Sequence, residues 1–152
     1  MKNILRKIGL WVLGIFLCLF LIGKFVGDNK GENKTKEQPL EYTLAVIDAG
    51  ESVSEDDIRI ARFRSLLTQL SSKYAETPEK IGNMTAFIKQ KLHDNGINES
   101  MLNIMEGINT LPVGNQKYDT YLTLYLSSRI GSMTHEETIT GLRQIANGLG
   151  MR

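Results

Sequence analysis

An uncharged, apolar run near the start of the chain constrains its fold more than any other feature. Residues 8–23 read IGLWVLGIFLCLFLIG, with basic side chains immediately before and after them. A helix that crosses a membrane needs about 20 apolar residues. The 16 residues of the run fall short of that length, but the apolar stretch continues to Val26 if Lys24 extends its amine to the membrane surface. The sequence therefore predicts a membrane helix over residues 4–26.

Two other interpretations of the run are a cleaved signal peptide and a buried helix of a cytosolic protein. A cleavable signal peptide has small residues just before the cut, but a cut after Gly23 would place Leu21 at the third position before it. A lipoprotein signal is disfavoured in the same way, because Leu17 precedes Cys18. We therefore favour a retained signal-anchor helix that crosses the membrane once.

Basic residues on the two sides of the run predict its orientation. Lys2, Arg6 and Lys7 form a compact cluster with no acidic residue, whereas the four basic residues that follow are spread over residues 24–36. The positive-inside rule places the compact cluster in the cytoplasm. We expect the protein in the plasma membrane, or in the inner membrane if it is bacterial, with the C-terminal part outside the cytoplasm.

The chain is predicted to have three parts: a transmembrane signal-anchor helix at residues 1–27, a flexible linker at 28–39 and a soluble α-helical domain at 40–152. The linker reads DNKGENKTKEQP, which contains no apolar residue and behaves as a solvated tether. The last part is long enough to bury one hydrophobic core without disulfides or a structural metal.

Apolar residues at steps of three and four predict helices at about residues 55–74, 78–95, 98–111, 116–129 and 134–149. Residues 40–49 fit both a helix and a strand, and a helix is favoured. The helix starts are predicted at Ser54, Pro78, Asn98 and the Thr134–Glu137 capping box. These elements predict an all-α fold, a compact bundle of about five short helices in which short connections favour antiparallel neighbours.

Charge and cysteine content narrow the possible partners. Hydrophobic residues make up 41% of the chain and charged residues 23%, which excludes a disordered protein. Residues 27–152 contain 14 basic and 17 acidic residues, a net charge of −3, so no nucleic-acid partner is expected. Cys18 is the only cysteine, so neither a disulfide-linked partner nor a paired-cysteine metal site is expected.

The densest group of acidic residues is the turn formed by Glu51, Glu55, Asp56 and Asp57. Acidic residues at a helix start are stabilised by the positive end of the helix dipole, which is the interpretation we favour. A pair of carboxylates in a cleft can also act as a general acid and base. This turn therefore remains the candidate site for an enzyme.

No other motif points to catalysis. His93 lies near a predicted helix end and His135 in a capping turn, and neither has a second histidine at metal-ligand spacing. No serine lies in a nucleophile elbow, and the glycines form no phosphate-binding loop. We therefore expect no catalytic residues, no metal and no cofactor.

Two further patterns admit both a structural and a functional interpretation. Tyr118, Tyr121 and Tyr125 share one helix face and could bind a partner, but core packing with hydroxyls at the domain rim is favoured. The basic turn at residues 59–64 contains three arginines, which we expect to be solvated or paired with the acidic turn four residues away. Contact with anionic lipid headgroups is the alternative.

The sequence favours a membrane-anchored helical module that binds another protein and has no enzymatic activity of its own. A flexible tether supports this function because it raises the effective concentration of the module near a membrane partner. The alternative is a small envelope-associated enzyme or inhibitor that uses the acidic turn at residues 51–57 or the His135–Glu136 pair. The binding residues and the identity of the partner are not predicted.

Overall fold

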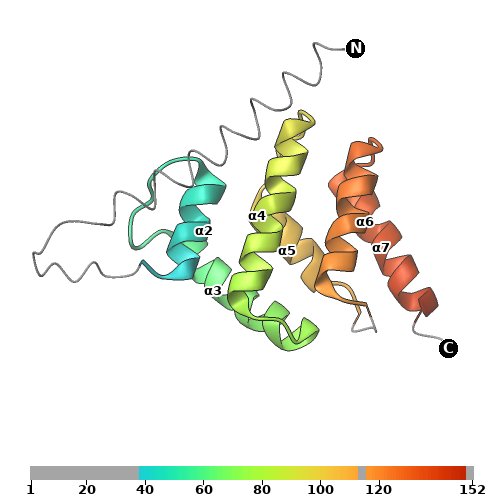
Figure 1. The fold of residues 1–152 in the computed structure, drawn as a ribbon, viewed down its shortest axis with the longest axis horizontal. Coiled ribbons are helices and arrows are strands. Elements are labelled where there is room, and N and C mark those ends of the chain that lie inside the picture. The colour runs from blue at the N-terminus through green and yellow to red at the C-terminus, as the bar shows by residue number, and fades with distance from the viewer. Residues whose placement is uncertain (1–37, 113–115, 150–152) are drawn as a thin grey trace, which may run out of the picture. The chain divides into compact units, whose positions relative to one another are not determined.

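The computed structural model describes residues 38–112 and 116–149, and within them the chain forms six helices and no strand (Figure 1). The helices are α2 (Leu40–Ala49), α3 (Ile58–Tyr74), α4 (Pro78–Asp94), α5 (Met101–Asn109), α6 (Tyr118–Ile130) and α7 (His135–Leu149). The all-α prediction is confirmed, and so is the choice of helix for residues 40–49.

The predicted membrane helix at residues 4–26 lies outside the described residues, as does most of the predicted linker. Within the described part, no helix combines the length and the apolar character that crossing a membrane requires. The anchor and the orientation therefore stay predictions.

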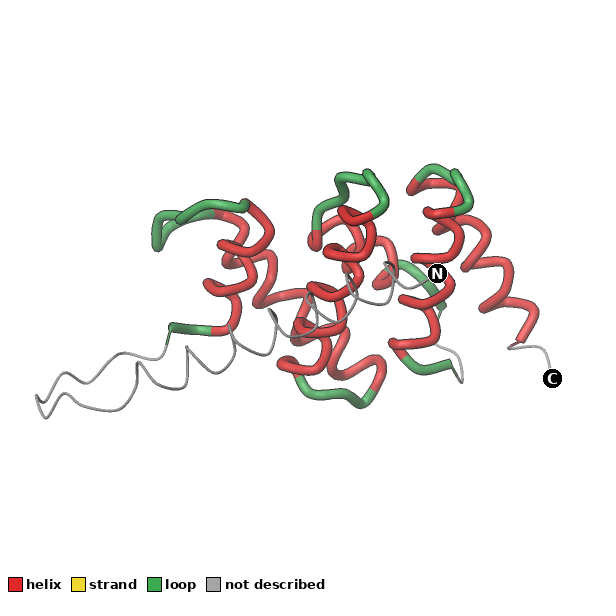
Figure 2. The backbone as a smooth tube through the Cα atoms, turned by 45° about the horizontal axis from the view of Figure 1, so that its top comes forward, coloured by secondary structure: helices red, strands yellow, loops and turns green. Residues whose placement is uncertain are grey.

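The helices form three successive hairpins, α2–α3, α4–α5 and α6–α7, which stand in a row. Figure 2 shows the three hairpin loops at one edge of the row and the connections between hairpins at the opposite edge. The first helices of the hairpins lie next to each other, since α4 packs on both α2 and α6, and α3 packs on α5. The predicted bundle thus takes the form of a row of hairpins.

The starts of α4 and α7 follow the local signals in the sequence. Pro78 occupies the first turn of α4, and the Thr77 side chain accepts the Lys80 N–H at 3.3 Å. At α7, the Thr134 N–H donates to the Glu137 carboxylate at 2.8 Å and the Glu137 N–H donates to the Thr134 hydroxyl at 3.2 Å. The predicted capping box is therefore confirmed.

Two predicted caps are wrong by two or three residues. Helix α3 begins at Ile58 because Asp57, and not Ser54, accepts the Arg59 N–H at 2.9 Å. Helix α5 begins at Met101 because the Ser100 hydroxyl, and not Asn98, accepts the N–H of the residue three positions later at 3.0 Å. In both cases the side chain nearer the helix is the one that reaches its free N–H groups.

The hydrophobic core runs along the inside of the row, and the closest helix contact in it depends on a glycine. Gly107 in α5 faces α7, where a Cβ atom built on it would lie 2.5 Å from Ile139 Cδ1 and 3.0 Å from His135 Cε1. A side chain larger than hydrogen fits at this position only if the side chains of Ile139 and His135, or α7 itself, move. Gly107 therefore sets the distance between the second and third hairpins.

Candidate functional site

The acidic turn lies at the surface before α3. Glu51, Glu55 and Asp56 are exposed, and Asp57 caps α3. Hydrogen bonds from the side chain and the backbone N–H of Arg59 lower the pKa of Asp57 to about 2. Asp57 is thus the only one of these four residues that contacts a basic side chain, and it serves as a helix cap. The turn does not bring two carboxylates together in a cleft.

The three arginines that follow the turn are all paired. Arg59 binds Asp57 with its guanidinium nitrogen 2.7 Å from the carboxylate. Arg62 donates to Glu106 on α5, and Arg64 donates to the α2 carboxylate of Glu41 at 2.8 Å. Arg59 thus pairs with the acidic turn, but two residues away and not four as expected. The expected pairing with that turn is wrong for Arg62 and Arg64, which instead connect α3 to α5 and α2.

Tyr118, Tyr121 and Tyr125 are fully buried, so the prediction that they belong to the core is confirmed. Their hydroxyls do not all reach the rim as expected. The Tyr118 hydroxyl lies 2.8 Å from the buried hydroxyl of Thr85 on α4, and the Tyr121 hydroxyl is buried with no hydrogen-bond partner among the described residues. Burial raises the pKa of all three phenols above the ordinary value.

His93 is exposed at the end of α4, whereas His135 belongs to a polar cluster that the sequence did not predict. Its Nδ1 lies 2.8 Å from the Tyr125 hydroxyl and 3.9 Å from the Glu99 carboxylate. Glu99, whose side chain is only 6% exposed, forms a 3.0 Å ion pair with Arg129. The cluster ties the segment before α5 to α6 and α7.

The contacts within this cluster account for the burial of the Glu99 carboxylate. A buried carboxylate is stable only when it is paired and hydrogen-bonded, and Glu99 accepts from both Arg129 and Asn103. Because Tyr125 keeps its proton at neutral pH, it is a suitable donor to the imidazole. These contacts satisfy the buried carboxylate of Glu99, while Arg129 Nε is buried with no partner among the described residues, and we interpret the cluster as structural. No local sequence signal connects its members, which come from a loop and two helices.

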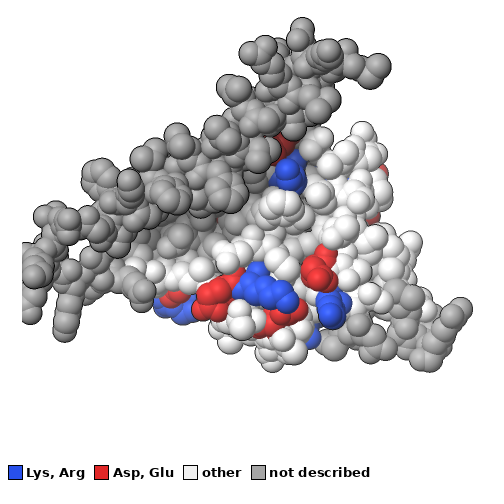
Figure 3. All heavy atoms as spheres, in the orientation of Figure 1, with Lys and Arg blue, Asp and Glu red and all other residues white. Residues whose placement is uncertain are grey.

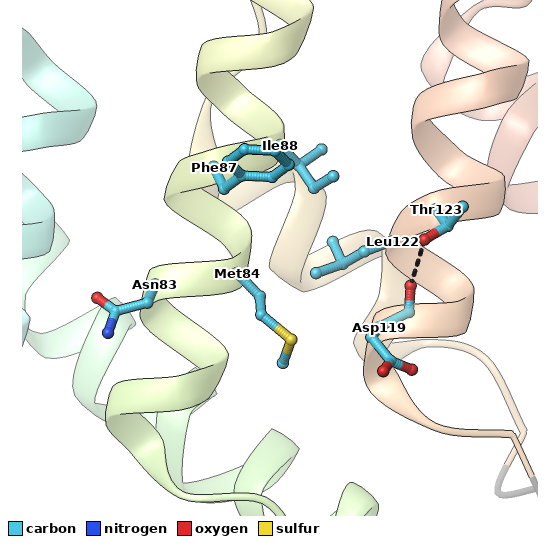
Figure 4. A pocket seen from close by; sticks show the side chains of 7 residues that line it. All are labelled: Asn83, Met84, Phe87, Ile88, Asp119, Leu122 and Thr123. Atoms are coloured by element: carbon cyan, nitrogen blue, oxygen red, sulfur yellow. Dashed lines mark hydrogen bonds between the residues drawn. The ribbon is translucent and has the colours of Figure 1, made fainter. Parts of the chain in front are cut away.

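An apolar pocket of about 300 Å³ opens between α4 and α6 (Figure 4). It is lined by Asn83, Met84, Phe87 and Ile88 from α4 and by Asp119, Leu122 and Thr123 from α6. Met84 and Leu122 point toward each other across the space between the helices, whereas Asn83 points away from it. Apolar residues at steps of three and four predicted α4 and α6 as helices, but no local pattern placed the two helices side by side.

Phe87 is the most unusual residue of this pocket. Its side chain is 59% exposed, although a phenylalanine normally contributes its large apolar surface to a core or an interface. The Lys91 ammonium lies 5.5 Å from the centroid of its ring. An exposed phenylalanine beside an apolar recess is typical of a surface that binds another molecule.

The surroundings of the pocket carry little charge. On the face shown in Figure 3, most charged side chains gather along the lower edge and a smaller charged group lies near the upper edge, with a largely uncharged area between them. Asp119 is the one charged residue that lines the pocket, and no ion pair joins it to another described residue. In the same part of the chain, no three His, Cys, Asp or Glu side chains gather closely enough to hold a metal ion.

The fold and the pocket define a small all-α protein built from helix hairpins, with an apolar recess on its surface. A family model described as MoxZ matches residues 50–147, which include α3 to α6 and most of α7. The chain therefore belongs to the MoxZ family. No curated protein and no solved structure matches it significantly.

Proposed function

We propose that this MoxZ family member is an accessory module without enzymatic activity that binds another protein through the face formed by α2, α4 and α6. The observation that carries the proposal is the apolar pocket between α4 and α6, with Phe87 exposed at its edge. Rows of helix hairpins build extended surfaces from their stacked helices, and such surfaces typically bind polypeptide segments. An exposed aromatic side chain beside a recess is a frequent anchor of such binding.

The second part of the proposal is that residues 4–26 hold the module at a membrane, with the domain on the extracytoplasmic side. Support comes from the apolar run and from the basic cluster that precedes it. A tether at residues 28–39 would let the binding face reach a membrane partner at high effective concentration. The anchor would then keep the pocket close to the partner, so that even a weak interaction stays bound.

The alternative of an enzyme or inhibitor that uses the acidic turn has less support. Its carboxylates are exposed, except for Asp57, which Arg59 and the helix start already occupy. General acid and base catalysis needs groups that share a sheltered site. The position of these residues offers no such site.

Site-specific photo-crosslinking tests the binding function. A photoreactive amino acid at Thr123, beside the pocket, is expected to crosslink the full chain reproducibly to one protein in native membranes. The adduct should disappear with Phe87→Asp, which places a charge in the recess. It should persist with Ile58→Asp, a matched control, because Ile58 is also exposed, at 75%, but lies at the start of α3. An adduct that persists with Phe87→Asp as it does with Ile58→Asp, or no adduct at all, would refute the proposal.

Cysteine labelling tests the membrane orientation separately. Ser72→Cys in a Cys18→Ser background gives one thiol at an exposed position of α3. An impermeant maleimide should label it in intact cells. Labelling only after lysis would contradict the proposed orientation. Recovery of the chain in the soluble fraction would contradict the membrane anchor.

A further inference from the structure

We infer that the partner segment that enters the α4–α6 pocket places a large apolar side chain next to a lysine or arginine. The inference rests on the proposed function and adds the chemistry of the partner to it. It depends on two features of the pocket: the side chains that form its floor and wall, and the single carboxylate at its edge.

The floor and wall select an apolar side chain. Met84, Ile88 and Leu122 form the floor, and the ring of Phe87 forms one wall. A space of about 300 Å³ has room for a large side chain such as leucine or phenylalanine. Methionine is flexible and polarisable, so Met84 can adapt its shape to either. Removing this surface from water supplies the affinity, because the pocket offers few polar groups to bind.

The carboxylate of Asp119 selects a cation. Some acidic residues of the described chain form ion pairs, such as Glu41 with Arg64 at 2.7 Å, whereas others, such as Glu79, form none. Asp119 differs from these residues because its carboxylate is the one charged group that lines the pocket. The Asp119 carboxylate has no ion pair among the described residues, and the one side chain among them that donates to it is the neighbouring hydroxyl of Thr120, at 3.3 Å. A basic side chain from a partner is the group that complements this carboxylate.

The pocket also has a direction. Helices α4 and α6 run the same way (Figure 1), so Asp119 lies toward their N-terminal ends. Phe87 and Lys91 lie toward the C-terminal end of α4, where the ammonium would repel a second cation. A bound segment therefore places its basic residue at the Asp119 end and its apolar anchor toward Phe87.

Methyl NMR with defined peptides tests the inference on the full chain in lipid nanodiscs. The probes are helical peptides with one leucine and phenylalanine stripe that differ only in the flanking residue, which is lysine, glutamine or glutamate. The ¹³C methyl signal of Met84 reports entry into the pocket. We expect the lysine peptide to bind about two- to fivefold more tightly than the glutamine peptide, the upper part of the range for a surface charge pair, and the glutamate peptide to bind most weakly.

Charge reversal at the pocket edge should invert this order. Asp119→Lys is expected to make the glutamate peptide the tighter ligand, and Asp119→Asn to remove the preference. Glu55→Lys changes the net charge by the same amount as Asp119→Lys, but at an exposed position before α3, and should leave the order of peptide affinities unchanged. An order that follows net charge in all variants, or a Met84 shift produced only by anionic lipid vesicles, would overturn the inference.

The outcomes for this inference and for the proposed function are separable. If no peptide shifts the Met84 signal while the Thr123 crosslink persists and still depends on Phe87, the chain binds a protein but the partner chemistry inferred here is wrong. If the crosslink is absent, the proposed function itself fails.

Discussion

A methyl group added at Gly107 should push α5 and α7 apart. The new Cβ would lie 2.5 Å from Ile139 Cδ1 and 2.8 Å from Cγ1, both in the core. Overpacking of this kind typically destabilises a protein by about 1–3 kcal/mol, and the better helix propensity of alanine offsets about 1 kcal/mol of that. Because 2.5 Å is a severe overlap, we expect Gly107→Ala to lower the free energy of unfolding by about 1–2 kcal/mol, measured by urea denaturation followed by circular dichroism.

The same substitution in α7 provides the control. A Cβ at Gly141 would meet only the end of the Met133 side chain, at 4.0 Å, so Gly141→Ala should stabilise the protein by about 0.5–1 kcal/mol. Ile139→Val removes the closest atom, and its combination with Gly107→Ala should be less destabilising than the sum of the two by roughly 0.5 kcal/mol or more. A Gly107→Ala protein as stable as the wild type, or strict additivity with Ile139→Val, would refute the close contact.

Three further predictions concern polar groups. The pKa of Asp57 is lowered from 3.8 to about 2, so its carboxylate stabilises the folded state above about pH 4, and this contribution is lost as the pH falls toward 2; Asp57→Asn should flatten the acid side of the stability profile in that range. Arg129→Met leaves the Glu99 carboxylate buried without its cation and should destabilise by about 3–5 kcal/mol, whereas adding Glu99→Gln to it should restore much of the loss in thermal and urea unfolding. Tyr118→Phe removes a buried hydrogen bond and should destabilise by about 1 kcal/mol, while Tyr121→Phe removes a hydroxyl with no partner among the described residues and should be neutral or stabilising; the opposite order would contradict the assigned contacts.

The helices were predictable because their signals are local. The capping box at residues 134–137 and the proline at the start of α4 act within one turn, so the sequence alone identifies them. The caps at Ser54 and Asn98 were misplaced because a second capping side chain follows each of them within three residues. Which of the two is used depends on where the chain turns into the helix, and that depends on packing.

The candidate site was not predictable because it depends on which helices are neighbours. Periodicity predicted α4 and α6 as separate helices, but only the packing of α4 on α6 creates a pocket with Phe87 beside it. The Glu99 and Arg129 pair is likewise separated by 30 residues in sequence. Such groupings follow from tertiary structure and leave no mark in a local pattern.

The row of hairpins has a consequence for how the chain folds during synthesis. The main helix contacts join elements that are at most two positions apart along the chain. Short sequence separation of this kind gives rapid folding, because little chain entropy is lost before each contact forms. Each hairpin can therefore assemble on the one made before it while the ribosome is still adding the next. Each new hairpin covers the apolar edge of the previous one and exposes its own, until α7 completes the row.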